Sequence, residues 1–502
     1  MHLPTIKSLW LGIVMVLAVS TITAQRGDGE NPFLDQEFWK SKPTPTEIEA
    51  GIAQGHSITE ANSGGFDAVT YAIFSNNPVT TISYLVEKGN DVNKRTHDSR
   101  TYIFWAASRG HLDIMEYLVG KGARMDLKDS HGYSVAQFTA ASGQENTKVY
   151  DFLIGNGTDL KNEKDHDGRN ILLVAAPRVQ NLDLVDYFIG KGLSLDATDD
   201  HGNGIFHMAA QGGNLTVLKA LVARGVPTRK NPVTGENAIL FASRGGRGTS
   251  NGLEIYTYLE GLGLNANITS KTGVTPVHQL ARATKDLKIF DYFMGKGVDP
   301  NAIDAEGNTP LLNAVSRNTM EVVKYFVGKT DAIDHSNQKG HTALALAVQN
   351  NGVDIVSYLL EQGARIDVVD PNGNTLVHYL LDTRGRPRDF EDKVKVLKEK
   401  GLDFTKPQGD KRNIWHMAVQ KNDLGLLAVL GDLGADINAR DEQGNTPLHY
   451  AAMETDTADI LKFLLDHGAN ATLTTEFGET AFDLASENEL LAKNKVDLAF
   501  LN

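Results

Sequence analysis

Four histidines recur at nearly regular intervals in the first half of the chain. His97, His131, His166 and His201 each lie one or two residues before a turn residue in consecutive segments. A catalytic zinc needs three protein ligands, with each nitrogen at about 2.0–2.1 Å. Packed helix layers are about 8–10 Å apart, so a third ring would begin about 20 Å away. The spacing argues against a shared three-histidine metal site. It favours exposed polar turns and leaves open a weaker partner or metal contact.

No catalytic motif accompanies these histidines. The chain contains neither His-Glu-x-x-His nor Gly-x-Ser-x-Gly. The glycine-rich stretch 246–248 has Asn251 where a third glycine of a phosphate-binding loop would stand, and no Gly-Lys-Ser/Thr follows. Residues 163–168 begin like a calcium loop, but the twelfth position is Val174 and not glutamate. We therefore expect no catalytic residue, no metal ion and no cofactor.

The chain is acidic and has no cysteine. Its 502 residues include 49 Lys+Arg and 63 Asp+Glu, with a formal net charge of -14. Affinity for nucleic acid and for anionic lipid comes largely from Lys and Arg. Because acidic residues outnumber them here, we do not expect sequence-independent binding to nucleic acid or to anionic lipid. The absence of cysteine excludes disulfides, thiolate metal sites and cysteine nucleophiles.

The first 24 residues have the layout of a secretory signal peptide. Lys7 precedes an apolar run from Leu9 to Val19, and a small residue, Ala24, precedes Gln25. The run is too short for a comfortable membrane span, and no other stretch approaches 18 apolar residues. We expect cleavage after Ala24 and a periplasmic or secreted protein without membrane insertion. An uncleaved N-terminal anchor is the alternative.

Two series of turn residues keep a common period of about 33 residues through most of the chain. Steps in the first series range from 33 to 38 residues. Its members are Gly65, Ser99, Gly132, Gly168, Gly202, Gly235, Gly273, Gly307, Gly340, Gly373, Lys411, Gly444 and Gly478. The second series consists of Gly89, Gly122, Gly157, Gly192, Gly225, Gly263, Gly297, Thr330, Gly363, Gly401, Gly434 and Gly468.

The clearest copy of the repeated unit is Thr446-Pro447-Leu448-His449, followed by Ala451-Ala452. A period near 33 with this motif resembles the ankyrin repeat, a turn followed by two antiparallel helices. The resemblance covers about residues 60–490 and implies an all-α solenoid of about thirteen stacked helix-turn-helix units with finger-like β-hairpin turns. Thr446 is placed to cap a helix, and Pro447 suits its first turn. His449 is expected to bridge adjacent repeats.

The repeats divide the chain into four segments. After the signal peptide (1–24), residues 25–64 are predicted to form an N-terminal capping half-repeat. Residues 65–477 form the repeat stack, and residues 478–502 form a C-terminal capping repeat. Each repeat buries its apolar face only against its neighbours, so the stack is expected to be continuous.

Some repeats depart from the Thr-Pro-Leu-His pattern or carry insertions, and these positions are candidates for contacts. The first three repeats lack the Thr-Pro-Leu-His motif, and Trp105 in the second is expected to pack in the core, with a binding anchor as the alternative. Basic insertions at 244–252 and 383–389 are expected between paired helices, where they are either solvated loops or contacts for an acidic partner. Five histidines in the motif position are expected to be structural: His207, His278, His378, His416 and His449.

The resemblance implies a non-enzymatic scaffold that binds another protein through the concave surface of finger tips and inner helices. Matching exposed positions would carry this binding, with the largest contributions expected from arginine and aromatic residues. We expect Arg100, Arg109, Tyr133 and Arg169 first, then His131, His166, His201 and Asn203. The alternatives are a ligand or metal receptor that uses the histidine row, and an enzyme on an ankyrin frame. The partner and the oligomeric state stay open.

Overall fold

The computed structural model of the chain describes residues 31–246, 249–383 and 388–502. The predicted signal peptide lies outside these described residues, as do parts of both basic insertions. The chain divides into two compact units, Met1–Ile205 and Phe206–Asn502, and each is described by itself. Within the described ranges, every helix is too short or too polar to cross a bilayer.

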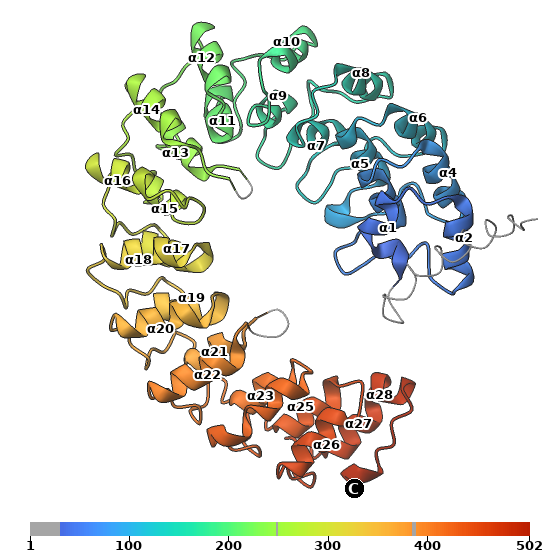
Figure 1. The fold of residues 1–502 in the computed structure, drawn as a ribbon, viewed down its shortest axis with the longest axis vertical. Helices are drawn as coiled ribbons and strands as arrows, with labels where there is room; N and C mark the ends of the chain where they lie inside the picture. Colours follow the sequence, from blue (N-terminus) through green and yellow to red (C-terminus); the bar gives the residue numbers. More distant parts are fainter. Residues whose placement is uncertain (1–30, 247–248, 384–387) are drawn as a thin grey trace, which may run out of the picture. The chain divides into compact units, whose positions relative to one another are not determined.

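The first unit is built from short helices that follow one another in pairs (Figure 1). The helix after each turn packs against its counterparts in the neighbouring pairs, as α5 does with α3 and α7. These inner helices are α3 (Ala68–Phe74), α5 (Tyr102–Arg109), α7 (Val135–Ala141) and α9 (Ile171–Ala175). The second helix of each pair is an outer helix: α4 (Val79–Glu87), α6 (Leu112–Gly120), α8 (Thr147–Gly155) and α10 (Asp183–Gly190).

The second unit repeats this alternation. Its inner helices are α11 (Ile205–Gly212), which begins at the boundary, α13 (Ala238–Arg244), α15 (Pro276–Leu280), α17 (Pro310–Arg317), α19 (Ala343–Asn350), α21 (Leu376–Leu381), α23 (Ile414–Val419), α25 (Pro447–Glu454) and α27 (Ala481–Glu487). Its outer helices are α12 (Leu215–Ala223), α14 (Leu253–Gly261), α16 (Leu287–Gly295), α18 (Met320–Val327), α20 (Val353–Glu361), α22 (Phe390–Glu399), α24 (Leu424–Ala428), α26 (Asp459–Asp466) and α28 (Glu489–Lys493). Both insertions lie between an inner and an outer helix, as predicted.

Before the first repeat, the chain forms α1 (Gln36–Lys40) and α2 (Pro45–Ala53). Trp39 of α1 is fully buried, and its indole N–H donates to the Phe33 carbonyl at 2.9 Å. The Phe33 ring is also fully buried and meets Phe38 edge to face at 5.6 Å. Because α1 packs against α3, these aromatic residues adjoin the first inner helix. The assignment of the two chain ends as caps stays a prediction.

The thirteen turn positions read from the sequence share one backbone conformation. Their φ angles all lie between 60° and 84°. Ser99 (60°) and Lys411 (63°) adopt this left-handed conformation although neither is glycine. Glycine reaches this region without the steric cost that other residues meet. The repeat geometry therefore demands the conformation even where the sequence supplies a less suitable residue.

A side chain three residues before the left-handed position holds most of these turns. In six of them it is an aspartate whose Oδ1 accepts the N–H groups two and four residues later at 2.7–3.0 Å. These residues are Asp129, Asp165, Asp199, Asp304, Asp370 and Asp441. The described residues contain isolated antiparallel bridges and no strand, and one of these bridges, Thr198 to Gly204, flanks the turn of Asp199. The finger tips are thus tight turns, many of them held by an aspartate, and the chain has the all-α repeat fold that was predicted.

The Thr-Pro-Leu-His motif has the role predicted for it. Thr446 Oγ1 accepts the His449 N–H at 3.4 Å, and the Thr446 N–H donates to His449 Nδ1 at 3.0 Å. That leaves the proton on His449 Nε2, which donates to the Leu473 carbonyl of the next finger at 2.9 Å. His416 makes the equivalent bond to the Asn445 carbonyl at 3.1 Å. The motif caps its own helix and joins neighbouring repeats.

Candidate protein-binding surface

The residue six positions after the turn is partly exposed in some inner helices and buried in others. In α7, Phe138 is partly exposed while its neighbours at 135–137, 139 and 140 are buried. In α3, Tyr71 is partly exposed between buried Thr70 and Ala72. We use the name inner face for the surface formed by this position, the residue directly after the turn and the end of the inner helix.

Four aromatic side chains lie in contact on the inner face of the first unit, and we call them the aromatic patch. Trp105 meets Phe74 edge to face at 5.1 Å and Phe138 edge to face at 5.3 Å. Phe66 lies 5.9 Å from Phe74 and 6.1 Å from Trp105. Trp105 is buried, as predicted, with 6% of its surface exposed, whereas the three phenylalanines are partly exposed. The patch presents apolar surface that a rigid aromatic anchor could use.

The two arginines expected on this surface differ in environment. Arg100 is buried, which corrects the expectation that it is exposed. Its Nε and Nη2 atoms each lie 2.8 Å from Asp129 Oδ2, and its guanidinium sits 4.0 Å from the centre of the Phe138 ring. Arg109 is exposed at the end of α5, with its guanidinium 5.2 Å from the Phe74 ring. Arg100 therefore supports the patch, and Arg109 is the exposed cation beside it.

Asp98 joins two of the finger histidines to this cluster. Its Oδ2 lies 2.9 Å from Arg100 Nη1, 3.3 Å from His131 Nε2 and 3.5 Å from His97 Nε2. Burial opposes ionisation of Asp98, but Arg100 and the two histidines outweigh it and hold the pKa of the carboxyl below its usual value. The His97 ring also stacks on Phe66 at 4.6 Å. The first histidines of the row thus belong to a charged network around the patch.

Tyr133 and Arg169 form a second cluster one repeat further along. The Arg169 guanidinium donates to Asp165 Oδ2 at 2.8 Å and to the Tyr133 hydroxyl at 3.2 Å. Burial raises the pKa of Tyr133, so its hydroxyl stays protonated. Both side chains are partly exposed. The structure brings these two predicted residues together, and much of the Arg169 hydrogen-bonding capacity is used within the chain.

The remaining predicted residues do not form a metal centre. The His166 ring lies against Gly132, where a Cβ would fall 2.4 Å from His166 Cδ2. Asn203 is buried and donates its backbone and side-chain N–H groups to Asp199, which corrects the expectation of an exposed contact. His201 is exposed, and its backbone N–H donates to Asp199 at 3.0 Å. Across the described ranges, no three His, Cys, Asp or Glu side chains form a group suited to a metal ion.

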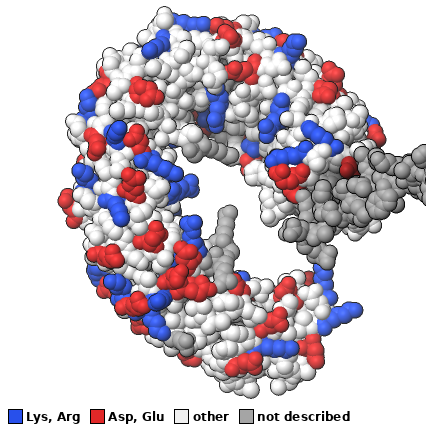
Figure 2. Space-filling model, in the orientation of Figure 1, with Lys and Arg blue, Asp and Glu red and all other residues white. Residues whose placement is uncertain are grey.

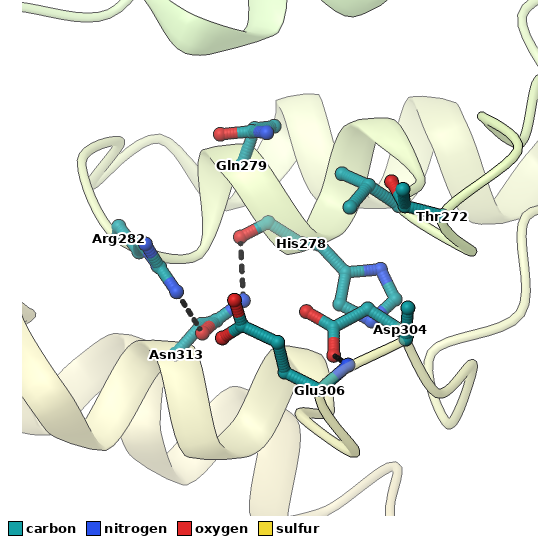
Figure 3. Close-up of a pocket in the computed structure, with 9 residues that line it drawn as sticks. Thr272, His278, Gln279, Arg282, Asp304, Glu306 and Asn313 are labelled. Atoms are coloured by element: carbon teal, nitrogen blue, oxygen red, sulfur yellow. Dashed lines mark hydrogen bonds between the residues drawn. The ribbon is translucent and has the colours of Figure 1, made fainter. Parts of the chain in front are cut away.

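The inner face of the second unit has a different chemistry. The positions equivalent to Phe138 are Gln279 and Asn313 in α15 and α17, where an open cavity is lined by polar side chains (Figure 3). A second cavity lies beside α21 and is lined in part by His341 and Tyr379. Burial lowers the pKa of His341. Lys, Arg, Asp and Glu are interspersed over the surfaces visible in Figure 2.

Sequence reasoning missed the three phenylalanines of the aromatic patch. It searched the positions beside the turns and found Arg100, Tyr133 and Arg169, but it did not follow the position six residues after each turn. That position is aromatic in the first three repeats, where it is occupied by Tyr71, Trp105 and Phe138. The signal for Phe138 was therefore present in the sequence as a second repeated position, whereas Phe66 stands directly after Gly65 and Phe74 ends α3.

Family comparison agrees with this repeat geometry. A pattern described as ankyrin repeats (3 copies) matches residues 48–129, 137–234, 277–370 and 311–408, and ankyrin repeats (many copies) matches residues 432–485. The chain belongs to the ankyrin repeat family. Ankyrin repeats suggest a protein-protein interaction scaffold.

Three individual ankyrin repeat proteins are similar to this chain over short segments. Protein fem-1 homolog C of Homo sapiens is 37% identical over 94 residues, which are 16% of this chain and 15% of that protein. Protein fem-1 homolog A of Bos taurus is 41% identical over 73 residues, 14% of this chain and 11% of that protein. A putative ankyrin repeat protein of Fowlpox virus is 32% identical over 68 residues, 14% and 15% of the two chains. The match thus covers well under a fifth of each relative.

Proposed function

We propose that this ankyrin repeat protein is a non-enzymatic scaffold that binds another protein through the inner face of its first unit. The aromatic patch beside the exposed Arg109 is the observation that carries the proposal. Binding energy at protein interfaces concentrates in a few aromatic and arginine side chains. The patch also needs little ordering on binding, because its rings are fixed by mutual contacts and by the guanidinium of Arg100 over Phe138.

The test is a variant that removes exposed parts of the surface and leaves its support in place. Arg109→Glu combined with Phe138→Ala should reduce capture of the partner in in-cell crosslinking with mass spectrometry by at least tenfold, because each hot-spot residue is worth about 2 kcal/mol or more. Arg100 is left intact because its loss would leave the buried Asp129 carboxylate without its cation.

A matched control is available on the outer side of the same unit. Arg124→Glu combined with Phe152→Ala changes an exposed arginine and a partly exposed phenylalanine away from the inner face. Both variants should keep helical circular dichroism and a cooperative thermal transition. Equal capture by the inner-face variant, the control and the unchanged protein would refute the proposed surface.

We place the action of this scaffold outside the cytoplasm, on the basis of the apolar run Leu9–Val19 and the small residue at Ala24. The purified exported protein is expected to begin at Gln25, as measured by intact mass and N-terminal peptide mapping. Placing an arginine at Val14 should interrupt the apolar run and retain the full-length chain in the cytoplasm. Recovery of an uncleaved protein from the cytoplasm of cells making the unchanged chain would contradict export.

A further inference from the structure

An exposed arginine in the second unit is held in one orientation by a buried amide. Asn313 of α17 is buried, and its Oδ1 accepts a hydrogen bond from Arg282 Nη2 at 2.9 Å. The Asn313 Nδ2 donates to the His278 carbonyl at 3.0 Å, which fixes the amide itself (Figure 3). Arg282 follows α15 and is exposed. The guanidinium is thus positioned before any ligand arrives, which lowers the entropy lost on binding.

The charge of Arg282 is not neutralised within the described part of the chain. No described carboxylate lies within ion-pair distance of it, and Asn313 is a neutral partner. Arg244 holds the equivalent place one repeat earlier, but it pairs with Glu236 at 2.6 Å. A cation at the end of a helix gains a little from the helix dipole. That gain does not explain why the buried Asn313 amide holds Arg282 in place, nor why Arg282 has no acidic partner.

The cavity beside Arg282 is bounded on its other side by a finger with acidic residues. The Asp304 carboxylate already accepts two backbone hydrogen bonds within its own turn, from the N–H groups of Glu306 and Asn308 at 2.9 and 2.8 Å. The exposed Glu306 receives one long hydrogen bond, 3.3 Å from Asn308 Nδ2. Arg282 and Glu306 both line the cavity of about 290 Å³ without pairing with each other. The cavity therefore has a cationic side at the helix end and an anionic side at the finger.

Gln279 of α15 is a third polar group that lines the cavity. It is partly exposed, lines the same cavity, and has no described hydrogen-bond partner for its side-chain amide. A primary amide has a donor and an acceptor and can pair with the N–H and C=O of one peptide unit. A guanidinium binds a carboxylate through two parallel hydrogen bonds. The three groups together match the main chain and two side chains of an extended segment.

We propose that the cavity between α15 and α17 binds an extended segment of a partner protein that carries an acidic side chain. Arg282 takes the carboxylate, and Gln279 pairs with the backbone next to it. Glu306 receives a hydrogen-bond donor from a neighbouring side chain and repels a second acid, so it sets the direction of the segment. This inference rests on the proposed scaffold function and adds the partner chemistry and a second contact site.

The test places a photocrosslinker at each site of the full chain in cells that make it. p-Benzoylphenylalanine replaces Gln279 in one protein and Phe138 in another, and crosslinked peptides are identified by mass spectrometry. The Gln279 probe should capture a segment with Asp or Glu within about three residues of the crosslink, the reach of an extended chain across the cavity. Adding Arg282→Glu should lower this yield at least tenfold, and Lys288→Glu, an exposed charge reversal on outer helix α16, should leave it unchanged.

Charge exchange completes the test. Replacing the acid of the captured segment by lysine should restore the crosslink in the Arg282→Glu protein. A captured segment without an acid, a yield that Arg282→Glu does not change, or no restoration by the exchange would overturn the inference. If the Phe138 probe captures a partner and the Gln279 probe captures nothing, the cavity inference fails while the scaffold function stands. If neither probe captures a protein, the proposed function fails as well.

Discussion

Lowering the pH from 7 to 5 should destabilise the chain, and replacing three buried histidines by glutamine should remove most of that dependence. His278, His416 and His449 are buried in the motif position, and each donates its Nε2–H to a carbonyl of the next repeat. Burial lowers the pKa of all three, because the charged imidazolium is desolvated there. The hydrogen bonds that these histidines donate to backbone carbonyls raise their pKa values, but by less than burial lowers them.

The sign of the effect follows from proton binding in the two states. In the unfolded chain these histidines take up protons as the pH falls through their ordinary pKa of 6.5. In the folded chain they stay neutral to a lower pH, because their pKa values are lowered. Acid therefore favours the unfolded state, and the stability present above pH 6.5 is lost below it. Each site that stays neutral in the folded chain costs up to about 1.4 kcal/mol per pH unit in this range.

The measurement compares urea midpoints at pH 7, 6 and 5. The triple variant His278→Gln, His416→Gln and His449→Gln keeps a neutral hydrogen-bonding side chain at each site. It should be less stable than the unchanged protein at pH 7, but its free energy of unfolding should change less between pH 7 and pH 5. His467→Gln, which removes an exposed imidazole in the same unit, controls for the loss of a histidine as such. An equally steep loss of stability in the triple variant would show that other groups control acid unfolding.

The repeat period and the turn glycines were sufficient to predict the architecture, because each position in the repeat has one physical task. Ser99 and Lys411 show how far this holds: the register placed them at turn positions, and both adopt the left-handed conformation. The five motif histidines show a limit of the same reasoning. Their role in bridging repeats is clear for His449, whereas His378 is partly exposed and lies 3.8 Å from Asp382.

The exposure of the candidate contact residues was predicted less well than the fold. Arg100 and Asn203 stand beside turns, where an exposed side chain was expected, but both are buried because a turn aspartate takes their donors. The register of a repeat tells which positions lie near the surface, but it does not tell which polar side chain bends inward to a buried acceptor. The clamp of Asn313 on Arg282 joins residues 31 positions apart, so only the packed structure brings it to light.

A buried lysine in the second unit should make the protein less stable than a methionine variant at neutral pH. Lys393 lies in the first turn of α22, is fully buried, and donates from Nζ to the Val348 carbonyl at 2.8 Å. Burial lowers its pKa from 10.5 to about 8, although Asp389 nearby favours the charged form. That difference corresponds to about 3 kcal/mol against the ammonium form relative to the neutral amine.

Lys393→Met removes the buried charge and keeps a flexible chain of similar length. It also leaves the Val348 carbonyl without this donor, which costs about 1 kcal/mol, so the expected net gain at pH 7 is on the order of 1–2 kcal/mol. Between pH 8 and 10.5 the unfolded chain binds a proton that the folded chain has released. The stability of the unchanged protein therefore rises with pH in that window, and the advantage of the variant shrinks.

Urea midpoints at pH 7 and pH 10 test both parts of this prediction. Lys395→Met is the matched control, because Lys395 is exposed two residues further along the same helix. It should change stability by less than about 0.5 kcal/mol, the usual range for surface substitutions. A Lys393→Met protein that is less stable than the unchanged chain at pH 7 would mean that the bond to Val348 outweighs the cost of burying the charge. Lys393 would then stabilise the contact between α22 and the end of α19 and would not be a source of instability.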